Sequence, residues 1–307
     1  MNQIILTQVF TLFLLMGVGI AARKAGCFTD AVAKGLSDLL MDFCLPALVL
    51  VSFQRRFDPA MLANAGRMLA SSLLVILFLV LAAWVLFLKA PAGQRPVLRF
   101  ITAFSNSGFM GIPLLAAIFP GMGVFYGAVF GIAFTLVAFT FGVMFFSTGG
   151  ERPSLVRLCL NPVLLATFAG LACFMCSVRF PEAVTGGLGM MGAMTMPMSM
   201  LIIGAMLAEA RPRDVLGGPW DYAACCGRLL LAPLLTMAVC ALLRLDPTIC
   251  RVLVILEALP GATIVAMFGE RYGGDMACIS RCTFLTTALS LVTIPAMIQV
   301  MGRFIGG

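Results

Sequence analysis

A long stretch without charged side chains constrains this chain more than any other feature of its sequence. No Asp, Glu, Lys or Arg occurs from Phe100 to Gly150. A helix crosses the hydrocarbon core of a bilayer with about 20 apolar residues, so this stretch has room for two membrane-spanning helices. The whole chain has the same character, because 62% of its 307 residues are hydrophobic and only 11% are charged. The sequence therefore predicts an all-α polytopic membrane protein.

Apolar runs bounded by charged residues divide the chain into ten predicted spans. We expect them at about residues 4–22, 33–53, 66–88, 97–119, 123–147, 158–178, 184–208, 218–243, 250–269 and 276–302. In the eighth range, Asp221 and Arg228 are expected near the interfacial end. If the N-terminus lies outside, most of the 20 lysine and arginine residues fall on the cytoplasmic side, which is the distribution that membrane insertion favours. We therefore expect a multi-pass protein of the cell inner membrane with both termini outside the cytoplasm.

The two halves of the chain carry helix-breaking residues at matching places. Pro46 in the second range and Pro197 in the seventh are 151 residues apart. Asn106 in the fourth range and Gly261, beside Pro260 in the ninth, are 155 residues apart. These similar separations indicate duplication of a five-helix unit, and because five is odd, the second copy must be inverted in the membrane. Inverted repeats with helices interrupted at matching places are typical of secondary transporters.

The duplication predicts how the chain is organised. We expect a first five-helix repeat at residues 1–150 and a second, inverted repeat at 151–307, within one integral membrane domain. The polar segment STGGERPSLVR between them is too short for a domain of its own and is expected to be a cytoplasmic connector.

The residues around Asn106 predict a broken helix that lines a binding site. Irregular backbone at membrane depth persists only where protein or a water-filled cavity covers it. The second half of a broken helix begins with unpaired N–H groups and about half a positive charge, so two such ends can bind an anion without lysine or arginine. The alternative is that the breaks serve packing alone. The predicted substrate-binding residues are Ser105, Asn106, Ser107, Gly108, Pro260, Gly261 and Thr263.

Two acidic residues are candidates for coupling or gating. Glu257 lies three residues before Pro260, and a carboxylate inside a membrane by default marks a transport pathway. The alternatives for Glu257 are a place in an outward-facing cavity and an ion pair with an arginine. Asp42 lies four residues after Asp38 on the same face of the second range, where the two either line the cytoplasmic mouth or pair with Lys34. No cofactor and no metal are expected, and the coupling ion would be H⁺ or Na⁺.

Other classes of protein fit the sequence less well. The chain has no histidine, which excludes His-dependent zinc hydrolases and Ser–His triads, and it has no GxSxG motif. We therefore expect that it is not an enzyme. No basic cluster is long enough for a nucleic-acid partner. A passive anion channel is the main alternative, although matched broken helices fit alternating access better than a fixed pore.

Several motifs, taken in order, resemble the auxin efflux carrier family over essentially the full chain. RKAGCFTDAVAKGLSDLLMDFCLPALVL is similar to the family's opening, FSNSGFMGIPLL to its fourth-helix motif, ALPGATIVAMFGERYGGD to its ninth and LTTALSLVTIP to its tenth. The resemblance implies ten helices in an inverted repeat, as in bile-acid:sodium symporters, with helices 4 and 9 crossing at the substrate. It also implies a scaffold of helices 1, 2, 6 and 7, through which these proteins frequently form homodimers.

Two departures from the plant members of the family bear on the substrate. The plant carriers have a proline before the crossing asparagine, where this chain has Ser105. They also carry a lysine shortly before the ninth-helix break, whereas here the ionisable group is Glu257. The resemblance therefore implies a bacterial type of carboxylate permease, with a small mono- or dicarboxylate such as malate or malonate as the substrate, rather than auxin.

Overall fold

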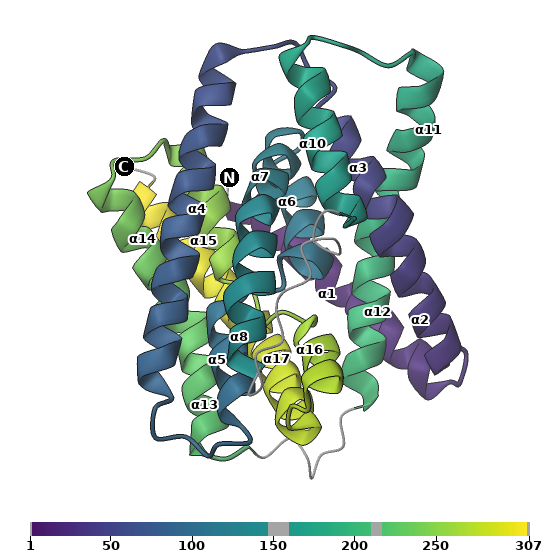
Figure 1. The fold of residues 1–307 in the computed structure, drawn as a ribbon. Coiled ribbons are helices and arrows are strands. Elements are labelled where there is room, and N and C mark those ends of the chain that lie inside the picture. Colours follow the sequence, from purple (N-terminus) through teal and green to yellow (C-terminus); the bar gives the residue numbers. More distant parts are fainter. Residues whose placement is uncertain (1, 147–159, 210–216, 306–307) are drawn as a thin grey trace. The chain divides into compact units, whose positions relative to one another are not determined.

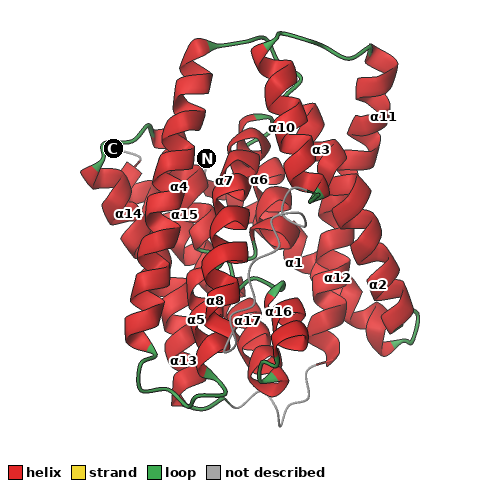
Figure 2. Cartoon of the chain, in the orientation of Figure 1, coloured by secondary structure: helices red, strands yellow, loops and turns green. Residues whose placement is uncertain are grey.

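The computed structural model describes residues 2–146, 160–209 and 217–305. Within these ranges every regular element is helical (Figure 2), which confirms the predicted all-α class. Six helical segments of the described residues are long and apolar enough to cross a membrane. They are Asp30–Ser52, Pro59–Leu86, Met122–Phe146, Glu182–Ala208, Pro219–Leu242 and Met276–Phe304.

The described residues contain helix in each of the ten predicted ranges (Figure 1). The first half of the chain forms α1 (Asn2–Lys24), α2 (Asp30–Leu39), α3 (Leu45–Ser52), α4 (Pro59–Leu86), α5 (Arg95–Ala103), α6 (Ile112–Ile118), α7 (Met122–Val137) and α8 (Val143–Phe146). The second half forms α10 (Pro162–Met175), α11 (Glu182–Ala193), α12 (Thr195–Glu209), α13 (Pro219–Cys226), α14 (Ala232–Leu242), α15 (Pro247–Glu257), α16 (Val265–Tyr272) and α17 (Met276–Ile305). The predicted connector, and with it the predicted repeat boundary at residues 150–151, lies outside the described residues.

Wide π-helical turns interrupt several spans just before a proline. Such turns at Leu40–Cys44, Ser107–Gly111 and Gly227–Leu231 are each followed, two residues later, by a proline near the start of the next helix. A proline has no N–H to donate, and its ring collides with the carbonyl four residues earlier. A wider turn relieves this collision within a continuous helical path.

A recurring sequence pattern fixes three helix starts. Asp58, Asn161 and Asp246 each precede a proline at the beginning of α4, α10 and α15. Each side chain accepts a hydrogen bond from the main-chain N–H two residues later, at 2.8–3.0 Å. An acceptor at the N-cap pairs a donor that the helix itself leaves free, and proline in the first turn lacks only a donor that would have had no partner.

The chain forms two compact units. The first comprises residues 1–68, 108–132 and 155–209. Within it α1 packs along α12, and α3 packs against α10 and α11 (Figure 1). The contact between α1 and α12 is close because both helices present glycine. A Cβ at Gly19 would overlap the main-chain carbonyl of Leu201, and one at Gly204 would overlap that of Met16.

The second unit comprises residues 69–107, 133–154 and 210–307. Within it α5 packs against α8, α13, α16 and α17, and α15 packs against α14 and α17. The core between these helices is aromatic. Phe100 is fully buried and contacts Phe104, Phe146 and Phe268, with ring centroids 4.6, 5.9 and 5.1 Å away. These contacts surround the end of α5, where the helical path of the fourth predicted span is interrupted.

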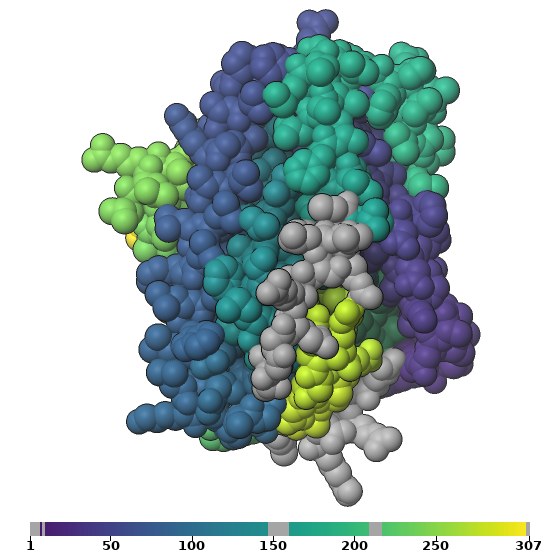
Figure 3. Space-filling model, viewed as in Figure 1, coloured from purple at the N-terminus to yellow at the C-terminus, as the bar shows by residue number. Residues whose placement is uncertain are grey.

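Large apolar side chains lie on the outside of the helices. The α4 helix is open to view along most of its length in Figure 3, and it exposes Leu74, Phe78, Leu81 and Val85. Soluble monomers rarely expose contiguous apolar surface of this kind. The exposed row on α4 is the surface expected of a helix in contact with lipid.

Candidate functional site

The second unit contains two helix breaks that the sequence predicts. The α5 helix ends at Ala103, and Phe104 follows in an extended conformation, with φ −117° and ψ 124°. The helical path resumes at Ser107. The other break separates α15, which ends at Glu257, from α16, which begins at Val265. Pro260 lies in this second break and cannot donate a helical hydrogen bond, which explains why α15 does not continue.

The two breaks are joined by main-chain hydrogen bonds. Ser105 and Gly261 form an antiparallel bridge. The N–H of Asn106 donates to the carbonyl of Pro260 at 2.8 Å, and the N–H of Ala262 donates to the carbonyl of Phe104 at 2.9 Å. The interrupted backbone therefore pairs with its counterpart, as irregular backbone in a membrane must.

The bridge requires glycine at position 261 because there is no room for a larger side chain. A Cβ at this position would come within 2.7 Å of the Ile101 Cδ1 atom and 3.0 Å of its Cγ2 atom. The Gly261 N–H donates to the Thr286 hydroxyl of α17 at 3.3 Å. Thr286, which was not among the residues predicted from the sequence, thus supports the second break from a neighbouring helix.

Two polar side chains at the first break have no partner. The side chains of Ser105 and Asn106 are buried, with exposures of 1% and 4%. Across the part of the chain that the structure describes, the Ser105 hydroxyl makes no hydrogen bond, and the Asn106 amide group makes none either. A buried polar group without a partner is costly and is rare in native proteins. The arrangement offers a hydroxyl and an amide to a ligand that supplies the missing hydrogen bonds.

The position predicted for Arg228 was wrong, because this residue is not near the interface. It lies in the π-helical turn between α13 and α14, in the middle of an apolar helix, and its side chain is 0% exposed. One guanidinium nitrogen donates to the carbonyl of Thr102 at 3.1 Å, and another donates to the carbonyl of Glu257 at 2.5 Å. Arg228 thereby binds carbonyls at the C-terminal ends of α5 and α15, where the helix dipole is negative.

Glu257 forms an ion pair with Arg228, an alternative that the sequence analysis left open. The carboxylate bonds to the same guanidinium nitrogen that binds the Glu257 carbonyl, and only 1% of the Glu257 side chain is exposed. The two charges compensate each other at a place where neither side chain is exposed. The signal for this pair was an arginine in the middle of an apolar span, because intramembrane charges generally pair with one another.

The remaining predicted residues are distributed over both units. Ser107 is buried, and its N–H donates to the carbonyl of Ser105 at 2.8 Å. Thr263 is half-buried just after the bridge. Gly108 begins the next part of the first unit, which also contains Asp42. Asp42 is exposed and forms no ion pair with another described residue, Lys34 included.

A second buried carboxylate, Asp221, lies with two cysteines in a group of described side chains that could hold a metal ion. One ligand atom each from Asp221, Cys278 and Cys282 lies within 4.8 Å of the others. The Asp221 carboxylate already accepts bonds from Arg281 at 3.1 Å and from both thiols at 3.4 Å. Arg281 therefore supplies the positive charge that a metal would bring, and these contacts explain the buried carboxylate without one.

Comparison with known proteins identifies the family. The model of the family described as "Membrane transport protein" matches residues 4–153 and 151–298. The chain belongs to this family. The resemblance to the auxin efflux carriers is thereby confirmed, and the transporter is a multi-pass membrane protein.

Two curated relatives carry transporter names. An "uncharacterized transporter" of Methanothermobacter thermautotrophicus is 24% identical over 296 residues, which cover 94% of this chain and 95% of that protein. A "putative malonate transporter" of Rhizobium meliloti is 26% identical over 237 residues, covering 74% of this chain and 73% of that protein. Both names agree with a transport function and with the expectation that the chain is not an enzyme.

Proposed function

We propose that this transporter is a secondary active carrier of a small organic anion, a mono- or dicarboxylate. It would move this substrate across the cytoplasmic membrane by alternating access. The proposed binding residues are those at the two helix breaks, with Asn106 and Ser105 as the side chains that bind the substrate directly. The name of the Rhizobium meliloti relative makes malonate the first substrate to test.

The observation that carries this proposal is the pair of unsatisfied polar side chains at the first break. The Asn106 amide offers two donors and one acceptor, and the Ser105 hydroxyl offers one donor. A carboxylate accepts such hydrogen bonds, and bonds to a charged group are stronger than bonds between neutral groups. Both side chains lie beside the bridge between Ser105 and Gly261, so the main chain holds them in a fixed position.

The charge near the breaks also suits an anion. The Glu257 carboxylate would repel a carboxylate substrate, but Arg228 compensates it through a direct ion pair. Arg228 also binds carbonyls at the C-terminal ends of α5 and α15. Neutral donors and the N-termini of the second half-helices then remain to bind the substrate.

The inverted repeat is part of the proposal, and the geometry of the bridge supports it. Asn106 and Gly261 lie at matching places in the two proposed repeats of residues 1–150 and 151–307, and Ser105, the neighbour of Asn106, forms an antiparallel bridge with Gly261. A pseudo-twofold axis between inverted repeats would bring equivalent residues together in this way. In the first unit, helices of the proposed scaffold, α1, α3 and α10–α12, pack against one another.

We further propose the inner membrane as the location, a homodimer through helices 1, 2, 6 and 7, and H⁺ or Na⁺ as the coupling ion. Glu257 and Asp42 are the proposed coupling or gating residues. In this view the ion pair between Glu257 and Arg228 is the gating element, because it ties the end of α15 to the middle of the eighth span.

Uptake of radiolabelled malonate into proteoliposomes tests the function. We expect accumulation above the outside concentration under an imposed gradient of protons or sodium, whereas a passive channel would only equilibrate the label. Asn106→Ala should weaken binding tenfold to a hundredfold, because it removes hydrogen bonds to a charged group, each worth roughly 1.5–3 kcal/mol.

The matched control for Asn106→Ala is Ser199→Ala. Ser199 is also buried, but its hydroxyl donates to the carbonyl of Met196 within α12. We expect this variant to transport normally. Normal uptake by well-folded Asn106→Ala protein would show that the site is misassigned.

A further inference from the structure

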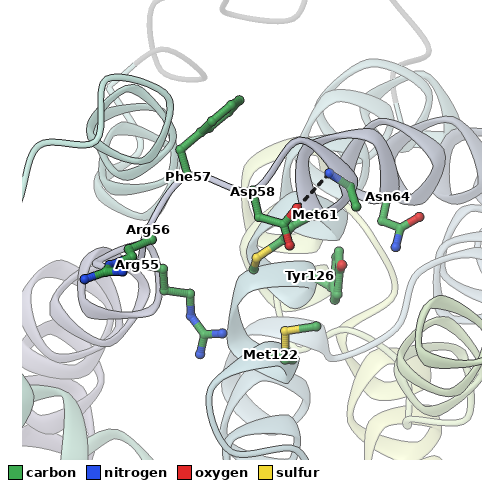
Figure 4. A pocket seen from close by; sticks show the side chains of 9 residues that line it. Arg55, Arg56, Phe57, Asp58, Met61, Asn64, Met122 and Tyr126 are labelled. Carbon is green, nitrogen blue, oxygen red and sulfur yellow. Dashed lines mark hydrogen bonds between the residues drawn. The ribbon is translucent and has the colours of Figure 1, made fainter.

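The first unit contains a cavity of about 430 Å³ whose lining residues do not include those of the helix breaks (Figure 4). Its volume falls within the range of about 300–1,000 Å³ that is usual for small-molecule sites. The cavity lies where the loop after α3 meets the starts of α4 and α7. Its lining residues are Arg55, Arg56, Phe57, Asp58, Ala60, Met61, Asn64, Met122 and Tyr126.

The cavity carries an excess of positive charge. Two arginines, Arg55 and Arg56, and a single carboxylate, that of Asp58, are among its lining residues, and of the two arginines Arg55 points into the cavity while Arg56 points away from Asp58 (Figure 4). Neither arginine forms an ion pair with any described residue. One Asp58 oxygen already accepts the main-chain N–H of Ala60 at 2.9 Å as the cap of α4. The local field therefore favours an anion.

The Arg55 side chain is held in place while its terminal donors stay available. Its Nε atom donates to the carbonyl of Ser52 at 3.1 Å. The guanidinium lies against Gly121, which has φ +89° and where a Cβ would overlap it. Figure 4 shows the side chain extending from the loop toward Met122 and Tyr126. No hydrogen bond to another described residue uses its two terminal nitrogens, and Arg55 is half-buried, which strengthens its attraction for an anion.

The rest of the wall combines one further donor with apolar surface. The Asn64 side-chain oxygen accepts from Arg67 at 3.5 Å, which leaves its NH₂ group as a donor. Met61 and Met122 supply flexible apolar walls. A guanidinium binds the two oxygens of an oxyanion in a bidentate manner, and methionine side chains adapt to a short aliphatic body.

We infer that this cavity is a second ligand site, which binds an organic oxyanion with a short apolar body through the Arg55 guanidinium. A free carboxylate is one source of this chemistry, and the phosphodiester headgroup of an anionic lipid is the other. The inference does not rest on the transport function, because the cavity and the helix breaks share no residue.

Chemical labelling of arginine measures directly whether a ligand covers Arg55. Purified transporter in phosphatidylcholine nanodiscs is treated with phenylglyoxal, and peptide mass spectrometry reports the modified fraction at Arg55 and at Arg303. Arg303 is an exposed arginine of the second unit and serves as the matched control. The experiment has three arms. In the first, malonate is added; in the second, chloride replaces it at equal ionic strength; in the third, the nanodiscs contain phosphatidylglycerol and no malonate is added.

We expect saturable protection of Arg55, by about tenfold, with malonate or with phosphatidylglycerol, and little change with chloride or at Arg303. Protection by malonate identifies a free carboxylate as the ligand, and protection by phosphatidylglycerol alone identifies the lipid headgroup. No protection in either arm, or equal protection of Arg55 and Arg303, would overturn the inference.

The Asn106→Ala variant separates this inference from the proposed function. Arg55 should still be protected in that variant if the two sites are independent, even when uptake is lost. Loss of protection in folded Asn106→Ala protein would contradict a second site.

Discussion

Arg228 binds both the carboxylate and the main-chain carbonyl of Glu257, and the two side chains are 0% and 1% exposed. The same guanidinium also reaches the carbonyl of Thr102 at 3.1 Å. One side chain therefore holds together the ends of α5 and α15, next to the bridge that joins the two breaks. Removing either partner leaves the other charge buried without compensation.

We predict that Glu257→Ala destabilises the transporter by roughly 3–5 kcal/mol, as expected when one partner of a buried ion pair is lost. Thermal unfolding in detergent can be followed with a thiol-reactive dye, because several free cysteines are buried. The control is Asp30→Asn, which breaks the pair between Arg23 and Asp30, whose carboxylate side chain is 87% exposed. That change should cost at most about 1 kcal/mol. Equal shifts in the two variants would contradict the role given to the buried pair.

The coupling or gating role of Glu257 predicts that Glu257→Gln changes the pH dependence of transport. Glutamine has nearly the same volume as glutamic acid but does not titrate, and it cannot form the ion pair with Arg228. Malonate flux should be measured in vesicles from pH 5 to 8 for the wild type and the variant side by side. If the two profiles have the same shape, Glu257 neither exchanges protons nor gates the site.

The bridge at the breaks predicts that Gly261→Ala impairs both stability and uptake. The added Cβ would come within 2.7–3.0 Å of the Ile101 side chain, and overpacking of this kind costs roughly 1–3 kcal/mol. The matched change is Gly187→Ala in α11, where no atom lies within 4 Å of an added Cβ. That control should be neutral or slightly stabilising, since alanine favours helix. Full activity of Gly261→Ala would argue against a tight bridge.

The close contact between α1 and α12 predicts that alanine at Gly204 lowers the melting temperature of the protein, whereas alanine at Gly17 does not. Gly204→Ala places a methyl group on the main chain of Met16, so the helices must separate and the melting temperature should fall by several degrees. Gly17→Ala on α1 has open space around the added methyl group and should not lower it. Thermal unfolding of both variants measures the difference, and similar melting temperatures would show that the two helices are not in close contact.

The predicted orientation is tested with reporter fusions. A reporter that is active only in the cytoplasm should give no signal after α17, because the C-terminal side is expected outside. The same reporter placed after Glu209, at the end of α12, should be active, because the seventh span is expected to end in the cytoplasm. The reverse pattern would invert the topology.

Hydrophobic patterning predicted the elements of the fold well, because membrane helices need long apolar runs and proline and glycine mark their interruptions. The breaks near Asn106 and Pro260 lie where the sequence places them. The pairing between the breaks was less accessible to sequence reasoning. The matched breaks and the family resemblance implied that helices 4 and 9 cross, but the individual hydrogen bonds, such as that from Asn106 to Pro260, join residues more than 150 positions apart and have no signal of their own in a single sequence.

The error at Arg228 has a physical reason. Hydropathy treats an arginine as an interfacial residue, since an isolated guanidinium in hydrocarbon is unfavourable. This rule fails where a buried carboxylate and free helix-end carbonyls offer partners, as Glu257 and Thr102 do here. The partners lie on other helices, so the sequence around Arg228 does not reveal them. The cavity at Arg55 was missed because its walls come from two helices and a loop.

The pairing of Arg228 with Glu257 also has an electrical consequence. Their opposite charges cancel within one ion pair, so this pair contributes no net charge if the breaks move with the substrate. An anion carried through the proposed site would then cross the membrane potential without compensation from this pair. Each uncompensated elementary charge exchanges about 2.3 kcal/mol with a potential of 100 mV. The direction of net transport would then depend on the membrane voltage. The strength of this dependence would be set by the number of charges that the substrate and its coupling ion carry together.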